Sequence, residues 1–247
     1  MPTPASDTKT TDDLANDVGT AVARHSRLVN WPVGLGFALL AGLIVWYLRR
    51  AVPQFLSYDA GRYGAHLWER RLVFLPHFIS AATALFLGLT QMWLGLSGRH
   101  WRLHRILGRL YLVTVACGCA GGCILAAMIM SQALVFASGF FFMGCAWAMT
   151  TALAFLAIRR RAVAVHREWM MRSYVIALAF VSFRVFGKLM QLTSLGSPEQ
   201  RPAALAWISW VVPLLAFEFF VQLRKLRSRK LTVPRPAGER RQEQTAL

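Results

Sequence analysis

Three histidines, His77, His104 and His166, each lie at the start of a long apolar segment of the chain. Imidazole is the commonest side-chain ligand of transition metals, and it also binds haem iron. At 100° per residue, small residues follow His77 and His104 along one helix face, where they let a backbone or a flat cofactor approach closely. Such faces are also typical of plain helix packing in membranes, so the pattern indicates candidate ligands without identifying a bound group.

Arginine and tyrosine residues accompany two of these histidines in similar short motifs. Residues 104–111 read HRILGRLY and residues 166–174 read HREWMMRSY, so in each motif His-Arg is followed by a second Arg and a Tyr. Arginines in such positions either neutralise the carboxylates of a bound cofactor or anchor a span at the cytoplasmic face of a membrane. The motif residues that we single out are Arg105, Arg109, Tyr111, Arg167, Trp169, Arg172 and Tyr174.

Three ionisable residues, Arg184, Lys188 and Glu218, lie inside apolar segments. Charged side chains within a bilayer are rare and costly, so each is a functional hypothesis by default. Helical spacing puts Arg184 on the face of His166, five turns and about 27 Å along the axis. We therefore expect Arg184 to face the bundle interior near His77. Lys188 can extend to the membrane surface, and Glu218 is expected to pair with a histidine or a loop arginine at the inner end.

The composition indicates that membrane-spanning helices position these residues. The chain of 247 residues is 56% hydrophobic, with a mean hydropathy of +0.43, whereas soluble domains are about 45–50% apolar. A helix needs about 20 apolar residues to cross a bilayer. The sequence therefore predicts an all-α bundle of about six transmembrane helices, near residues 32–48, 73–97, 107–130, 133–158, 171–192 and 204–223.

The distribution of the net charge of +17 predicts the orientation of the bundle. Of the 28 lysines and arginines, 20 lie in tails and loops on one side of a six-span chain, and six lie on the other side. Because cytoplasmic loops are rich in Lys and Arg, both termini are expected in the cytoplasm of a bacterial cell, with the protein in the inner membrane. The basic tail is expected to contact anionic lipids, and nucleic acid is not an expected partner, since no soluble fold remains to bind it.

The chain is expected to have three parts. Residues 1–30 are polar and predict a disordered cytoplasmic tail, with a short interfacial helix near 12–28 as an alternative for part of it. Residues 31–223 form the six-span domain, and residues 224–247 form a basic, disordered cytoplasmic tail. The four cysteines lie inside apolar segments without a C-x-x-C pair, so no structural disulfide is expected.

The two histidine motifs resemble those of a bacterial family of predicted multi-spanning membrane proteins, classed as a domain of unknown function. Members of that family carry H-R-x-x-G-R-x-Y and then H-R-x-W-M-x-R-S-Y, which match residues 104–111 and 166–174 here. The resemblance includes an arginine about ten residues further on, Arg184, and a histidine that opens the preceding span, His77. It covers roughly residues 70–190 and implies a membrane location but no established activity.

Three interpretations of the function stay open. The first is a redox protein in which His104 and His166 bind b-type haem or a metal ion, with His77 and Arg184 as further cofactor-binding residues. Its partner would be a quinone or a respiratory-chain protein. Against it, these histidines lie nearer the membrane surface than haem ligands usually do, and His77 has no obvious facing ligand.

The second interpretation is a carrier of small anions that uses Arg184, and the third is a non-catalytic assembly factor of the membrane. The sequence contains neither a G-x-S-x-G nor an H-E-x-x-H motif, which disfavours a hydrolase. Whether the chain is an enzyme stays open.

Overall fold

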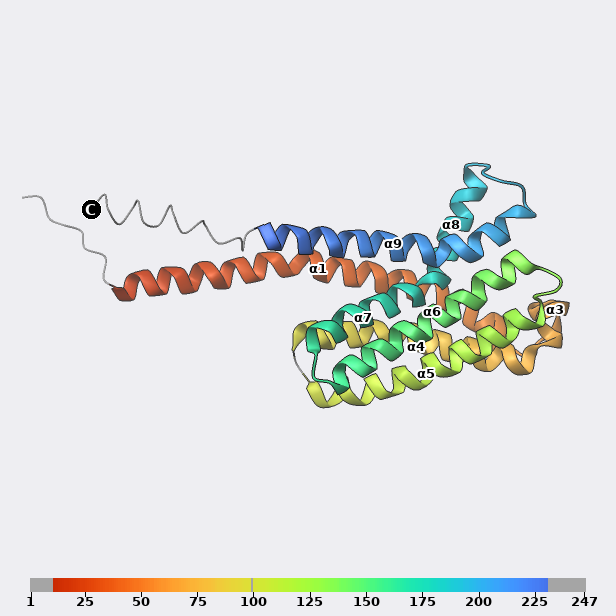
Figure 1. Cartoon of the computed structure of the whole chain (residues 1–247), viewed down its shortest axis with the longest axis horizontal. Coiled ribbons are helices and arrows are strands. Elements are labelled where there is room, and N and C mark those ends of the chain that lie inside the picture. Colours follow the sequence, from red (N-terminus) through yellow and green to blue (C-terminus); the bar gives the residue numbers. More distant parts are fainter. Residues whose placement is uncertain (1–10, 99, 231–247) are drawn as a thin grey trace, which may run out of the picture. The chain divides into compact units, whose positions relative to one another are not determined.

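The structure is a computed structural model that describes residues 11–98 and 100–230, with side chains for residues 34–98 and 100–227. All regular elements within these residues are helices, which confirms the all-α prediction. In chain order they are α1 (Thr11–Leu56), α2 (Ala60–Tyr63), α3 (Ala65–Glu69), α4 (Arg71–Ser97), α5 (Trp101–Met128), α6 (Leu134–Arg159), α7 (Val163–Ala177), α8 (Ala179–Leu192) and α9 (Gln200–Lys230) (Figure 1).

The number of candidate spans agrees with the prediction. Among the described residues, five helices are long and apolar enough to cross a bilayer, and α7 with α8 makes a sixth span if this bent pair is counted as one. The observed helices are longer than the predicted segments: α5 begins at Trp101 and α9 continues to Lys230. Counting apolar residues finds only the hydrocarbon part of a helix, whereas arginine and lysine are good helix formers that extend it.

The terminal segments are helical where they are described. The chain divides into two units, Met1–Arg50 and Ala51–Leu247. In the first unit α1 begins at Thr11 and includes residues 12–28, where the sequence allowed a short helix as the alternative to a disordered tail. At the other end α9 is helical past residue 224, while residues 1–10 and 231–247 lie outside the described residues.

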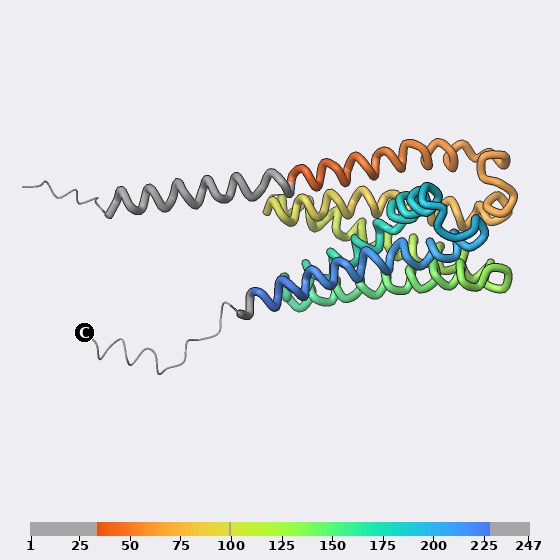
Figure 2. Tube along the Cα trace, turned by 90° about the horizontal axis from the view of Figure 1, so that it is seen from above, coloured from red at the N-terminus to blue at the C-terminus, as the bar shows by residue number. Residues whose placement is uncertain are grey.

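Four helices of the second unit form a bundle. Helices that follow one another in the chain from α4 to α7 pack side by side, and α7 also packs against α4. Helices α5 and α7 therefore occupy opposite corners of the bundle, as do α4 and α6. Helix α9 packs along α6 and α7 and makes a hairpin with α8 (Figure 2).

Hydroxyl groups connect three helices at the centre of this bundle. The Tyr111 hydroxyl lies 2.9 Å from the Ser173 hydroxyl, which lies 2.7 Å from that of Thr151. On the neighbouring side, Tyr174 donates a hydrogen bond of 3.1 Å to the Leu85 carbonyl of α4. Its ring lies so close to Gly88 that a Cβ at that position would collide with it. These four hydroxyl groups are thus hydrogen-bonded across helices, and they restrict how each helix can rotate.

The last span bends by 46° between α7 and α8. No proline or glycine lies at the bend; instead the Ser182 hydroxyl donates to the Leu178 carbonyl at 3.2 Å, beside the main-chain bond from the same residue at 2.9 Å. Such bonding from a serine to a carbonyl four residues earlier bends helices. Because of the bend, one straight face cannot run from His166 to Arg184, and the prediction that Arg184 faces the bundle interior is wrong: this side chain is exposed.

Candidate functional site

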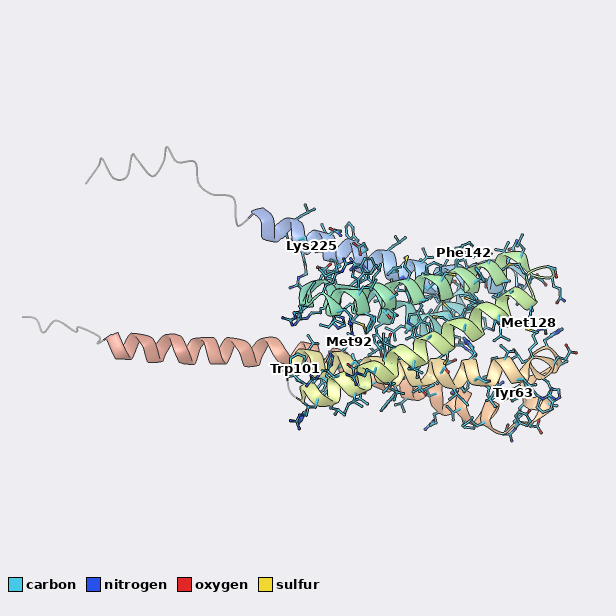
Figure 3. The ribbon with its side chains drawn as sticks, turned by 60° about the horizontal axis from the view of Figure 1, so that its bottom comes forward. Tyr63, Met92, Trp101, Met128, Phe142 and Lys225 are labelled. Carbon is cyan, nitrogen blue, oxygen red and sulfur yellow. The ribbon has the colours of Figure 1, made fainter. Side chains whose placement is uncertain are left out.

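A cavity of about 310 Å³ lies at the end of the bundle where α4 gives way to α5 and α6 gives way to α7. We call it the inner cavity, because the adjoining loops are the ones predicted to be cytoplasmic. Met92 and Trp101 line it, and Figure 3 shows them at one end of the bundle, whereas Tyr63 and Met128 lie at the other.

Two of the three predicted histidines meet at this cavity. His104 from α5 and His166 from α7 both line it, and their rings lie within range of each other's charge. Since α5 and α7 occupy opposite corners of the bundle, the two imidazoles approach from opposite sides. The two histidines therefore lie at the same end of the bundle.

The hydrogen bond of His166 determines its tautomer. Its Nδ1 lies 2.8 Å from the Ala154 carbonyl oxygen of α6. A carbonyl oxygen can only accept, so Nδ1 carries a proton, and in the neutral ring Nε2 keeps its lone pair. Metal-ligating histidines typically donate their second N–H in this way, which orients the ring and raises the basicity of the ligating nitrogen.

The hydrogen bonding of His104 is less complete than that of His166. Its Nδ1 is buried and interacts with the main-chain carbonyl of Gln91, but no hydrogen bond of good geometry forms with any described residue. The side-chain Nε2 of Gln91, a residue that is 6% exposed, is likewise buried without a partner among the described residues. Since both residues line the inner cavity, its wall presents hydrogen-bonding capacity that the protein itself does not use.

The predicted arginines fall into two groups. Arg105, Arg109 and Arg167 line the inner cavity and are exposed, so they form a cationic rim. Arg172 lies elsewhere: its Nη2 is 2.6 Å and its Nε 2.9 Å from Oε2 of Glu218. The prediction that Glu218 pairs with an arginine at the inner end is therefore confirmed.

This ion pair belongs to a larger group that we call the α7–α9 cluster, formed by Glu168, Arg172, Glu218, Gln222 and Lys225. Glu168 accepts from Lys225 at 2.7 Å and lies 3.6 Å from an Nη1 of Arg172. The Arg172 guanidinium also lies over the Trp169 ring, 4.9 Å from its centre. Arg172 thus connects α7 to α9, with the Trp169 ring beside it, and neither residue lines the inner cavity.

Tyr111 and Tyr174 line the inner cavity, but their hydroxyls are engaged within the core by Ser173 and by the Leu85 carbonyl. They shape the floor of the cavity and leave its hydrogen bonding to the histidines, the arginines and Gln91.

His77 does not join the other histidines. It lines a second cavity of about 480 Å³, the outer cavity, at the opposite end of the bundle. Its Nδ1 lies 2.8 Å from the Gly118 carbonyl of α5, and its ring lies 6.1 Å from that of Phe180. Arg184 lines neither of these two cavities.

Sequence reasoning missed the main-chain carbonyls of Ala154 and Gly118, which orient two histidines. No sequence pattern marks a carbonyl acceptor, because every residue carries one. Gln91 was detectable, since it is the only amide side chain within its predicted span.

The side chains at the inner cavity do not form a site for a bare metal ion. Across residues 34–98 and 100–227, no group of three or more His, Cys, Asp and Glu side chains could hold a metal. A bare transition-metal ion needs three or four protein ligands, and the inner cavity has two histidines.

Comparison with protein families shows which family the chain belongs to. The model of a family described as "Predicted membrane protein (DUF2306)" matches residues 74–221, more than half of the chain. The matched region contains His77, His104, His166 and Glu218, and it begins within α4 and ends within α9. No curated protein and no solved structure matches the chain.

Proposed function

Because the chain belongs to this membrane-protein family, whose description states no activity, we propose its function from the site: the inner cavity would hold a b-type haem, bound by His104 and His166. The chain is then a redox protein of the bacterial inner membrane. When bound, the haem supplies one-electron transfer.

One observation carries the proposal: imidazoles from opposite corners of a four-helix bundle line one cavity, and the His166 ring is held so that Nε2 keeps its lone pair. Two helices at opposite corners can hold a flat ring system between them without displacing either helix. The main-chain bond from Ala154 keeps the His166 ring from rotating, so little ordering is needed when a ligand binds.

The surrounding residues suit a haem in charge and in polarity. Haem carries two propionate groups, and Arg105, Arg109 and Arg167 at the rim offer cations to them. Gly95 leaves space beside His104: a Cβ there would lie 3.5 Å from His104 Cε1. Met92 and Trp101 provide apolar wall that would keep water from an iron centre.

The same proposal includes an orientation and partners. The excess of Lys and Arg in the loops beside the inner cavity favours a cytoplasmic location for this end and for both termini. A haem there would exchange electrons with a quinone or with a respiratory-chain protein, while the basic C-terminal segment would contact anionic lipids.

The test is the visible spectrum of the full-length protein, expressed with ample haem and purified in detergent. We expect a Soret band and a sharp α band on reduction, both abolished in His104→Ala and in His166→Ala. The matched control is His100→Asn, since His100 lies one turn from His104, outside the cavity, at a positive φ of 57° that asparagine tolerates.

A colourless protein, or an intact Soret band in both alanine variants, would contradict the proposal. The assembly-factor and anion-carrier interpretations would then remain. The carrier has less support than the sequence indicated, since Arg184 is exposed and lines neither of the two cavities.

A further inference from the structure

The outer cavity has no role in the proposed haem site, yet its histidine, His77, makes the same kind of hydrogen bond to a main-chain carbonyl as His166 does. Because the Gly118 carbonyl accepts from His77 Nδ1 at 2.8 Å, Nδ1 carries the proton and Nε2 is a hydrogen-bond acceptor. Two glycines of α5 enclose the ring: a Cβ on Gly121 would lie 2.8 Å from His77 Cβ, and one on Gly122 would lie 3.0 Å from Cε1. A ligand meeting this group must therefore offer a hydrogen-bond donor.

The walls of the outer cavity are flat and apolar. Phe136 and Phe140 come from α6 and Phe180 from α8, with Phe74 of α4 nearer the mouth. Aromatic rings in such an arrangement favour a planar, unsaturated ring by stacking and edge contacts. The shape and polarity disfavour a sugar, a nucleotide or an inorganic anion, each of which needs several polar partners.

A second polar group lines the same cavity. Arg70 donates from Nη1 to the His66 carbonyl at 2.8 Å, while its Nε is buried with no partner among the described residues. Arg70 lines the cavity, as His77 does. Seven residues, about two helical turns, separate Arg70 from His77, so the cavity has one polar group at each of two positions along α4.

From these contacts we infer that the outer cavity binds the ring of a membrane hydroquinone. One hydroxyl donates to His77 Nε2, the oxygen at the opposite end of the ring accepts from Arg70 Nε, and the phenylalanines flank the ring. The apolar tail of a quinol extends into the lipid. This site does not depend on the haem at the inner cavity, so either one can be present without the other.

The test compares two probes on the wild-type full-length protein in detergent under anaerobic conditions. Decylubiquinol has both hydroxyls, whereas its dimethyl ether has the same ring and tail but cannot donate. Calorimetric titration should give a dissociation constant at least tenfold lower for the quinol, the effect of one lost hydrogen bond to a buried acceptor. Equal affinities for the two probes would overturn the inference.

Substitutions at His77 and Arg70 test which side chains contact the quinol. His77→Phe keeps a flat ring and removes the acceptor, and it should weaken quinol binding at least tenfold without changing binding of the ether. Arg70→Gln should weaken quinol binding severalfold. The matched control is Arg71→Gln, because Arg71 bonds to Tyr58 and to the Trp68 carbonyl and does not line the cavity.

Haem variants separate this inference from the proposed function. His104→Ala should remove the Soret band and leave quinol affinity unchanged, whereas His77→Phe should do the reverse. Unchanged quinol affinity in His77→Phe would overturn the inference, and so would a loss of haem absorbance in His77→Phe, which would identify the outer cavity as a haem site.

Discussion

The inner and outer cavities each contain a histidine whose Nδ1 lies 2.8 Å from a main-chain carbonyl of a neighbouring helix: Ala154 for His166 and Gly118 for His77. Opposite that histidine, the inner cavity has a second imidazole, from His104, and the outer cavity has phenylalanine rings. In both cavities, this hydrogen bond at Nδ1 therefore leaves Nε2 of the histidine as the acceptor. The groups that face Nε2 decide whether this nitrogen suits a metal centre or an organic hydrogen-bond donor.

The two cavities also differ in charge and in the space around their histidines. Exposed arginines surround the inner cavity, whereas Arg70, which lines the outer cavity, has a buried Nε. A Cβ on Gly95 would make an ordinary contact with His104, but one on Gly121 would overlap His77. The backbone of α5 thus encloses His77 tightly, whereas Gly95 packs less closely against His104.

The largest expected effect is on haem content. His166→Ala should reduce the haem absorbance per protein to background, whereas His77→Ala should leave it intact, because His77 lines the other cavity. The reduced-minus-oxidised spectrum, normalised to protein, measures this. Equal losses in both variants would remove the distinction between the cavities.

The next largest effect is on stability and concerns the α7–α9 cluster, which lies at the inner end of the bundle. Glu218→Gln should lower the free energy of unfolding by about 1–3 kcal/mol, because Arg172 loses charge-assisted hydrogen bonds at a side chain that is only 11% exposed. Lys225→Ala is the control: its side chain is 47% exposed, and its loss should change stability by about 0–1 kcal/mol. Thermal unfolding followed by tryptophan fluorescence checks both, and a larger loss in Lys225→Ala would show that the cluster is organised differently.

Glycine substitutions should show the difference in space. Gly121→Ala should destabilise the protein by about 1–3 kcal/mol, because the new methyl group overlaps His77. Gly95→Ala should be neutral or slightly stabilising, since alanine is the better helix former and its Cβ makes only an ordinary contact. The two unfolding temperatures can be compared directly, and equal values would mean that the outer histidine is not enclosed.

The smallest effect belongs to the loop that precedes α4. Tyr63 donates to the Phe55 carbonyl at 2.6 Å, and burial raises the pKa of its phenol above the ordinary value. Because the pKa is higher in the folded protein, the protonated phenol stabilises the fold fully below the ordinary pKa of tyrosine, near 10. This contribution is lost as the pH rises through the pKa of the folded protein. Tyr63→Phe should cost about 1 kcal/mol at neutral pH.

The pH dependence provides the control for this last effect. Above about pH 10 the unfolding temperature of the wild type should fall faster than that of Tyr63→Phe, while at neutral pH the wild type is the more stable. Parallel curves for the two proteins would show that this phenol does not contribute to the alkaline loss of stability.

Helix formation and membrane insertion depend mainly on properties that add along the chain, so much of the fold could be predicted. Long apolar segments identified the spans, and their alternating direction placed His104 and His166 at one end and His77 at the other. The pairing of Glu218 followed from its depth, since an acid near the inner surface meets the arginines there. The family match, over residues 74–221, extends over all of these spans except the first.

Contacts between helices depend on how each helix is rotated and where it bends, and these are decided only by packing. The bend at Leu178 carried Arg184 away from the face that helical spacing had predicted, because a serine hydroxyl competes for a main-chain carbonyl. The carbonyls of Ala154 and Gly118 hold two imidazoles through groups that every residue possesses. The sequence by itself therefore determined which side chains reach each end of the bundle, and the tertiary structure decided which of them face one another and which nitrogen each histidine presents.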